Sequence, residues 1–152
     1  PLLEMYPALE TVPLPDDRFA VYLNRRDAEK VREQGMAYLD ELTHIMEYRS
    51  QGGPLFAGTI FTIREALGLK SQNISYHYAN STILITVQTG MGFAFLPWQM
   101  NFSQCPEGVV KIPLDIPEAE IPRSLGWHRS NSNPALMRFV ESVSDTPETE
   151  SV

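Results

Sequence analysis

The sequence has little cysteine, little positive charge and no long apolar run. Its 152 residues contain one cysteine, Cys105, which excludes an internal disulfide framework and favours a reducing compartment. The formal net charge of −7 argues against a surface that grips nucleic-acid phosphates. No apolar stretch approaches the roughly 18 residues that cross a bilayer, and the N-terminus carries no signal peptide. We therefore expect a cytoplasmic protein with no membrane partner.

Sequence motifs of enzymes and of metal sites are also missing. Gly90-Met91-Gly92 lacks the third glycine and the preceding strand of a dinucleotide-binding fingerprint. The sequence has neither a Gly-x-Ser-x-Gly elbow nor a phosphate-loop lysine motif. The three histidines, His44, His77 and His128, are not spaced as metal ligands with Cys105 or with nearby carboxylates. Cys105 has no base or cation beside it in the sequence that would activate the thiol. We therefore expect no catalytic residues, no metal and no cofactor.

The most informative stretch that is present runs from Thr86 to Pro97. An apolar periodic run that begins at Asn80 ends at Gly90-Met91-Gly92, and a short apolar segment follows and stops at Pro97. This pattern predicts a helix over 80–89 capped by Asn80 or Ser81, a tight glycine connection, and a strand over 93–97 that is buried on both faces. The period-two spacing of β-branched residues within 82–87 leaves a strand there as the alternative.

The remaining elements alternate along the chain. Prolines at positions 1, 7, 13 and 15 exclude a helix and predict mostly irregular structure over 1–17. The patterns then predict strands at 19–23, 45–48, 74–78, 109–113 and 124–128, and helices at 27–34, 36–42, 54–67 and 133–143. The prolines at 113, 117 and 122 predict a loop or a chain crossing between lobes over 113–122. We expect Asp27 to cap the first helix, and Ile74, Tyr76 and Tyr78 to form the buried face of their strand. This order predicts an α/β fold with a mainly parallel sheet and helices on both faces, in which ligands bind at the carboxyl ends of the strands.

Several short motifs, taken in order, resemble LysR-type transcriptional regulators. Residues Val87 to Pro97 resemble the family's helix ending in Val-x-x-Gly-x-Gly, followed by an apolar strand and Leu-Pro. Further similar segments are Asp17–Leu23, Asp40–Leu42, Gly108–Leu114, Ser124–Arg129 and Asn133–Phe139, so that the resemblance covers about residues 10 to 144. The family's His-Pro-Leu-Ala motif after the opening strand is absent, and so is a winged helix-turn-helix.

The resemblance implies a periplasmic-binding-protein-like (Rossmann-like) lobe from the C-terminal effector-binding domain of such a regulator. The implied domains are an irregular lead-in over 1–16, a second regulatory lobe over 17–106, crossover strands and a last helix of the first lobe over 107–144, and a disordered acidic tail over 145–152. The implied function is sensing of a small-molecule co-inducer and formation of a homodimer or higher oligomer, with DNA contacted only through an N-terminal domain absent from this chain. The alternative is a solute-binding lobe of a transport system.

The resemblance also implies a set of ligand-binding residues. They are Glu47, Tyr48, Arg49 and Ser50 after a strand, Thr89 and Met91 at the glycine turn, and His128 near the crossover. Arg49 could pair with a carboxylate, which makes a carboxylate one candidate effector; the alternative is a solvated loop cation. Thr89 could instead satisfy the backbone at a helix end. For the helix over 54–67, we expect Phe56, Ile60, Ile63 and Leu67 to pack on the sheet, and Thr59, Thr62 and Arg64 to face outward as a candidate dimer surface.

Overall fold

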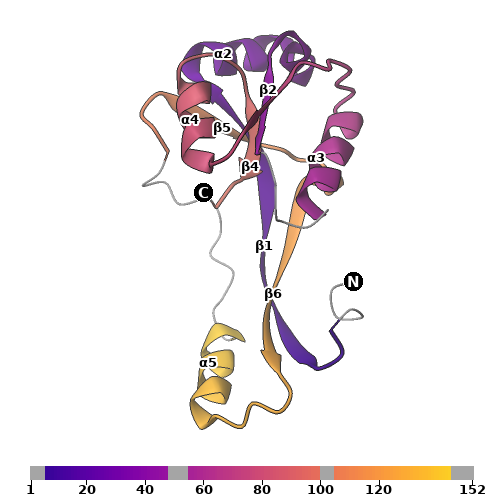
Figure 1. The fold of residues 1–152 in the computed structure, drawn as a ribbon, viewed down its shortest axis with the longest axis vertical. Helices are drawn as coiled ribbons and strands as arrows, with labels where there is room; N and C mark the ends of the chain where they lie inside the picture. Colours follow the sequence, from indigo (N-terminus) through magenta and orange to yellow (C-terminus); the bar gives the residue numbers. More distant parts are fainter. Residues whose placement is uncertain (1–5, 48–54, 100–104, 145–152) are drawn as a thin grey trace. The chain divides into compact units, whose positions relative to one another are not determined.

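A computed structural model describes residues 6–47, 55–99 and 105–144, and omits the side chains of 55–57 and of 144. The chain divides into two compact units: residues 18–120 form one, and residues 1–17 with 121–152 form the other. Its described elements are α-helices, 3₁₀ turns and strands (Figure 1), which confirms the α/β class. This division places residues 107–120 with the larger unit. The assignment of 17–106 and 107–144 to two regulatory lobes stays a prediction.

The larger unit is built on the second part of strand β1 (Leu9–Asn24), which belongs to it from Arg18 onward. β1 pairs antiparallel with β4 (Ala94–Pro97) on one side, where Val21 lies opposite Phe95, and antiparallel with β5 (Val109–Pro113) on the other. β2 (His44–Glu47) and β3 (Ile74–His77) pair in parallel, because a helical crossover joins them. A parallel bridge between His44 and Phe93 links β2 to the start of β4. The prediction of a mainly parallel sheet is not confirmed, since both ladders of β1 are antiparallel.

Two helices lie on either side of these strands (Figure 1): α3 (Leu55–Ala66) and α4 (Asn80–Gln88). Alternate residues of a strand point to opposite faces. On one face, buried residues of α4 pack on the strands, and this core cluster comprises Ala20, Tyr22, Ile45, Ile83, Leu84, Val87, Ala94 and Leu96. Ile60 and Ile63 of α3 are also buried, as predicted, whereas Leu67 is half-buried and the side chain of Phe56 lies outside the described residues.

The glycine turn between α4 and β4 forms as predicted. Gly90 has a φ of 80° just past the helix end, a conformation that glycine adopts without a Cβ clash. Gly92 has a φ of 153°, and a Cβ there would lie 2.1 Å from the carbonyl oxygen of Thr43. Phe93 to Leu96 are buried, as expected for a covered strand. The alternative of a strand over 82–87 is wrong. So is the predicted cap, because Ala79 occupies the N-cap position and makes no side-chain hydrogen bond there.

Two predictions near the N-terminus are corrected. Residues 9–17 are extended and belong to β1, because proline forbids a helix but fits an extended strand where no ladder needs its N–H. Helix α2 (Arg25–Gln34) is capped by Asn24, whose side chain accepts from the backbone N–H of Asp27, so Asp27 is not the cap. Gly35 ends α2 as predicted, and the 3₁₀ helix η1 (Met36–Glu41) forms the expected helical turns.

Strand β3 is less buried than its alternation predicts. Tyr76 is 52% exposed and Tyr78 is 79% exposed, so these tyrosines do not form a buried face. In the described part of the chain β3 pairs only with β2, and an edge strand has less cover than a central one. The predicted loop over 113–122 contains a short 3₁₀ helix, η3 (Pro117–Ala119), whose Ala119 is fully buried.

The smaller unit holds β6 (Glu120–His128) and α5 (Pro134–Ser144). β6 pairs with β1 and is longer than the predicted 124–128. Within this unit, Nε of Arg123 donates to the carbonyl oxygen of Pro15 at 2.8 Å. Helix α5 begins as predicted, with the side chain of Asn133 accepting from the backbone N–H of Ala135 at 3.0 Å. The predicted acidic tail lies outside the described residues.

Candidate functional site

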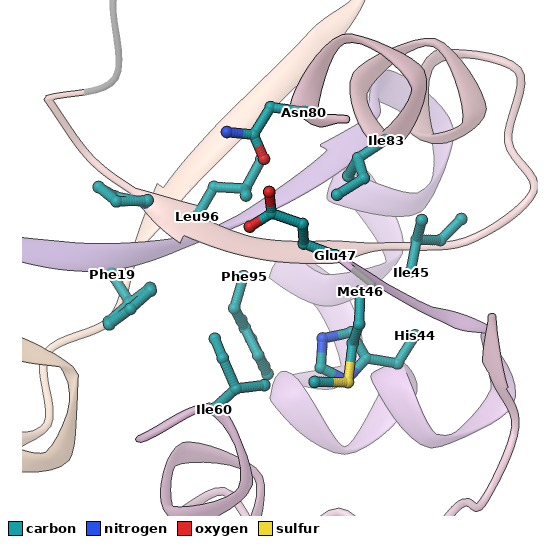
Figure 2. Close-up of a pocket in the computed structure, with 11 residues that line it drawn as sticks. Phe19, His44, Ile45, Met46, Glu47, Ile60, Asn80, Ile83, Phe95 and Leu96 are labelled. Atoms are coloured by element: carbon teal, nitrogen blue, oxygen red, sulfur yellow. The ribbon is translucent and has the colours of Figure 1, made fainter. Parts of the chain in front are cut away.

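A pocket of about 160 Å³ opens in the larger unit where β2 and β4 separate (Figure 2). The two strands are joined around Phe93, whose N–H donates to Thr43 and whose carbonyl accepts from Ile45. Beyond that point the strands diverge, and the later residues of both line the pocket. The lining residues are Phe19, His44, Ile45, Met46, Glu47, Ile60, Asn80, Ile83, Phe95, Leu96 and Pro97.

The pocket reaches both faces of the strands. In Figure 2, Phe19, Phe95 and Ile60 lie on one side of the strand ribbons, and Asn80 and Ile83 lie on the other. Its walls are mostly aliphatic and aromatic, with polar groups from His44, Glu47 and Asn80. An apolar hollow with a few polar groups at the carboxyl ends of parallel strands is the usual setting of a small-molecule site.

His44 is the most deeply buried polar group of the pocket, with 1% of its surface exposed. Nη1 of Arg64 lies 2.9 Å from Nδ1 of His44, and Nη2 of Arg64 donates to the carbonyl oxygen of Ser71. Burial, and secondarily the guanidinium charge, lower the pKa of His44 to about 3. His44 is therefore uncharged at neutral pH.

Aromatic contacts fix the plane of the His44 ring. It stacks on Phe93, with the ring centroids 4.6 Å apart and the planes 9° apart. It meets Phe95 edge-on at 5.0 Å. These contacts restrict rotation of the ring and hold its nitrogens in set positions.

Asp40 helps to hold Arg64, the hydrogen-bond partner of His44, in place. Its carboxylate accepts from the backbone N–H groups of Lys70 and Ser71 at 2.8 Å and 2.9 Å. These two hydrogen bonds lower the pKa of Asp40, and the charges of Arg64 and Lys70 contribute further. The loop that Asp40 holds includes Ser71, whose carbonyl accepts from Arg64. Asp40, Ser71 and Arg64 thus form a chain of contacts that ends at His44.

The structure brings one of the predicted ligand residues into this pocket. Glu47, at the end of β2, lines it. Tyr48, Arg49 and Ser50 lie outside the described residues. Thr89 and Met91 precede Phe93 in the chain, so they lie at the opposite end of β4 from Pro97. Both are exposed, and the hydroxyl of Thr89 donates to the carbonyl of Thr86, which satisfies the helix end.

Two further predicted positions lie elsewhere. His128 belongs to the smaller unit, where its Nδ1 lies 2.7 Å from Oγ of Ser130. Arg64 is 5% exposed, so the predicted outward face of α3 does not include it. Its guanidinium turns inward because it finds two acceptors there, at His44 and Ser71.

Sequence reasoning missed most of the pocket, notably Phe19, His44, Asn80 and Pro97. The sequence did contain a signal for two of these residues, Pro97 and Asn80. Pro97 ends a predicted strand and Asn80 follows one, and strand ends are where ligands bind in α/β sheets. His44 precedes the strand expected at 45–48, so the sequence places it at the start of that strand and not at its carboxyl end. The partnership of His44 with Arg64, twenty residues later, had no sequence signal.

A second hollow of about 330 Å³ involves Trp98, Cys105 and Lys111. Nζ of Lys111 lies 4.3 Å from the centroid of the Trp98 ring and donates to the Trp98 carbonyl at 2.6 Å. Burial raises the pKa of the Cys105 thiol, and the Lys111 charge offsets this in part. The thiol is therefore protonated and weakly nucleophilic at neutral pH.

The described residues contain neither a metal-binding cluster nor a membrane-spanning helix. No three or more His, Cys, Asp or Glu side chains there come together in a way that could hold a metal ion. In the same part of the chain, every helix is too short or too polar to span a bilayer.

No protein-family model and no curated protein matches the sequence. Solved structures do match. The chain superimposes on CbnR, a LysR-family transcriptional regulator, with a TM-score of 0.66 over 91% of its length at 18% identity. The BenM effector-binding domain with its effector benzoate matches with a TM-score of 0.62 over 93% of the chain at 19% identity. The chain has the fold of a LysR-type effector-binding domain.

The chain matches only part of each of these solved proteins. The chain spans 47% of CbnR and 68% of the BenM domain. It also spans 65% of the OxyR2 regulatory domain from Vibrio vulnificus, with a TM-score of 0.63 and 17% identity. The LysR-type fold seen here therefore corresponds to about half of a full-length regulator.

Proposed function

We propose that this chain is the small-molecule-sensing and oligomerising part of a LysR-type transcriptional regulator. The observation that carries the proposal is the apolar pocket at the carboxyl ends of β2 and β4, within a fold similar to that of the benzoate-bound BenM domain. In this proposal the regulator is a cytoplasmic homodimer or higher oligomer, and a separate domain of the longer protein contacts DNA. The pocket residues bind a ligand and perform no catalysis.

The mechanism is a shift between two arrangements of the regulator. A ligand in the pocket contacts the ends of β2 and β4 together with α3 and α4, so it favours the arrangement in which these elements fit it best. It can shift the equilibrium only by the ratio of its affinities for the two arrangements. A tenfold preference corresponds to about 1.4 kcal/mol of coupling free energy.

Glu47 and Arg49 bear on which chemical class of ligand the pocket would bind. Glu47 lies at the pocket, and Arg49 follows two residues later, outside the described residues. The carboxylate effector therefore stays a prediction that rests on Arg49. If Arg49 pairs with a ligand carboxylate, Arg49→Ala will weaken benzoate binding, whereas Arg49→Lys will restore it only in part, because lysine lacks the bidentate fork.

The test is a binding screen with single-ring compounds, followed by NMR of isoleucine methyl groups. We expect a binding compound to shift the methyl signals of Ile60 and Ile83, which line the pocket. Ile60→Phe narrows the pocket and should abolish binding. Ile85→Phe makes the same change on the exposed side of α4, where Ile85 is 56% exposed, and should leave binding intact. A ligand that binds both variants equally well would contradict the assigned site.

A further inference from the structure

The ring nitrogens of His44 have fixed roles. A guanidinium can only donate hydrogen bonds, so Nδ1 of His44 must accept from Arg64. The ring is uncharged at neutral pH, and a neutral imidazole carries one proton. That proton is therefore on Nε2. Arg64 acts as a lock that makes His44 a hydrogen-bond donor and removes its capacity as an acceptor.

The donor opens onto the pocket. His44 is a lining residue, and among the described residues the one observed hydrogen-bond partner of its imidazole ring is Arg64, at Nδ1. In the same part of the chain no fully enclosed side-chain nitrogen or oxygen lacks a partner. Nε2 is therefore not fully enclosed, and because His44 lines the pocket, we infer that this nitrogen faces the pocket space. A donor on an otherwise apolar wall favours a molecule that brings an acceptor to it.

The size of the pocket limits the body of that molecule. A cavity of about 150 Å³ lined by aliphatic and aromatic groups holds one benzene ring, and this pocket measures about 160 Å³. Phe19, Phe95 and Ile60 supply the apolar surfaces that such a ring would contact. The space thus suits one ring with a short substituent.

We propose that His44 is the specificity-determining residue of this pocket and that it selects single-ring ligands carrying a carbonyl oxygen, which accepts the Nε2 proton. The inference rests on the proposed ligand-sensing function and specifies its chemistry. Amides and carboxylates share the acceptor, so the class includes both. Arg64 is a positioning residue, because it acts on the ligand through His44.

The first experiment compares benzamide, benzoate and toluene as probes of the wild-type protein. Benzamide or benzoate should bind about three- to tenfold more tightly than toluene, the gain expected from one hydrogen bond. His44→Phe keeps an aromatic ring against Phe93 but has no nitrogen, so it should remove this preference. Toluene binding as tightly as both other probes would overturn the inference, and so would an unchanged preference in His44→Phe.

The second experiment begins with the wild-type protein, so its main readout does not depend on how well His44→Phe folds. Nitrogen-15 NMR of wild-type His44 should show the proton on Nε2, and its signal should shift downfield when benzamide or benzoate is added. Arg64→Met removes the hydrogen bond to Nδ1 of His44, so the ring proton should exchange between Nδ1 and Nε2. A proton on Nδ1 in the wild type, or an Nε2 signal that stays fixed at saturating probe, would overturn the inference.

The two proposals fail in different ways. If none of the three probes binds and no other single-ring compound binds, the ligand-sensing proposal fails, and the inference fails with it. If compounds bind and shift Ile60 and Ile83 but ignore the nitrogens of His44, only the present inference fails.

Discussion

Asn24 and Asp27 hold each other at the start of α2 through two reciprocal hydrogen bonds. The backbone N–H of Asp27 donates to Oδ1 of Asn24 at 2.8 Å, and Nδ2 of Asn24 donates to Oδ2 of Asp27 at 2.7 Å. The hydroxyl of Tyr38 donates to the other carboxylate oxygen at 3.1 Å. Asp27 is fully buried, so this pair joins the end of β1 to α2 and η1.

Replacing Asp27 with alanine should therefore destabilise the protein. The change leaves Nδ2 of Asn24 and the Tyr38 hydroxyl without their acceptor in the core, at a cost of about 2–4 kcal/mol. Urea unfolding followed by circular dichroism will measure the loss. Glu29→Ala changes an exposed residue of the same helix and should alter the free energy of unfolding by less than about 0.5 kcal/mol. Equal effects of the two substitutions would contradict the role assigned to Asp27.

Gly92→Ala should be among the most damaging single-methyl additions. The new Cβ would lie 2.1 Å from the carbonyl oxygen of Thr43, at a residue whose φ is already 153°. We expect a loss of more than about 3 kcal/mol, or failure to fold, because backbone must move to relieve the clash. Gly35→Ala is the matched control: its φ is 80°, but nothing lies within 4 Å, so conformational strain of about 1–2 kcal/mol should be the whole effect.

The buried neutral His44 should make stability depend on pH in acid. In the folded protein its pKa is lowered from 6.5 to about 3, so between these values only the unfolded chain binds the proton. The contribution of His44 is complete above pH 6.5 and decreases towards pH 3, with a slope of up to about 1.4 kcal/mol per pH unit. Urea titrations across this range should show a flatter profile for His44→Phe. His128→Phe, at an exposed position, should keep the wild-type slope.

Asp40 should contribute in a more acidic range. Backbone N–H groups of Ser71 and Lys70 lower its pKa below the ordinary 3.8, so its carboxylate stabilises the folded state above pH 3.8, and this contribution is lost as the pH falls through the folded pKa. Asp40→Asn keeps the shape but removes the charge, so it should be less stable than wild type at pH 7. The difference should shrink as the pH falls through the lowered pKa of folded Asp40. A constant difference at all pH values would contradict the charge-based explanation.

Local signals predicted much of the backbone. The glycine pair at 90 and 92 predicted the turn into β4, and Asn133-Pro134 predicted the start of α5, because each requirement is met within a few neighbouring residues. The cap of α2 was misplaced by three residues because Asn24 and Asp27 are both good caps. The direction of β1 was missed, since strand pairing depends on contacts distant in sequence.

The site was less predictable for the same reason. Glu47 was found because it follows a predicted strand. Thr89 and Met91 were chosen for their nearness to the glycines, but sequence did not reveal which end of β4 faces the pocket. That is fixed by the bridge between His44 and Phe93, which sets the parallel register. The inward turn of Arg64 depends on acceptors from two other segments.

The join between β2 and β4 has a mechanical consequence. Backbone hydrogen bonds connect the two strands around Phe93, and past it they are separated by side chains and the pocket. Among the described residues no backbone ladder joins the far ends of these two strands. The width of the pocket at those ends is thus set by the packing of the lining side chains and not by backbone hydrogen bonds between β2 and β4.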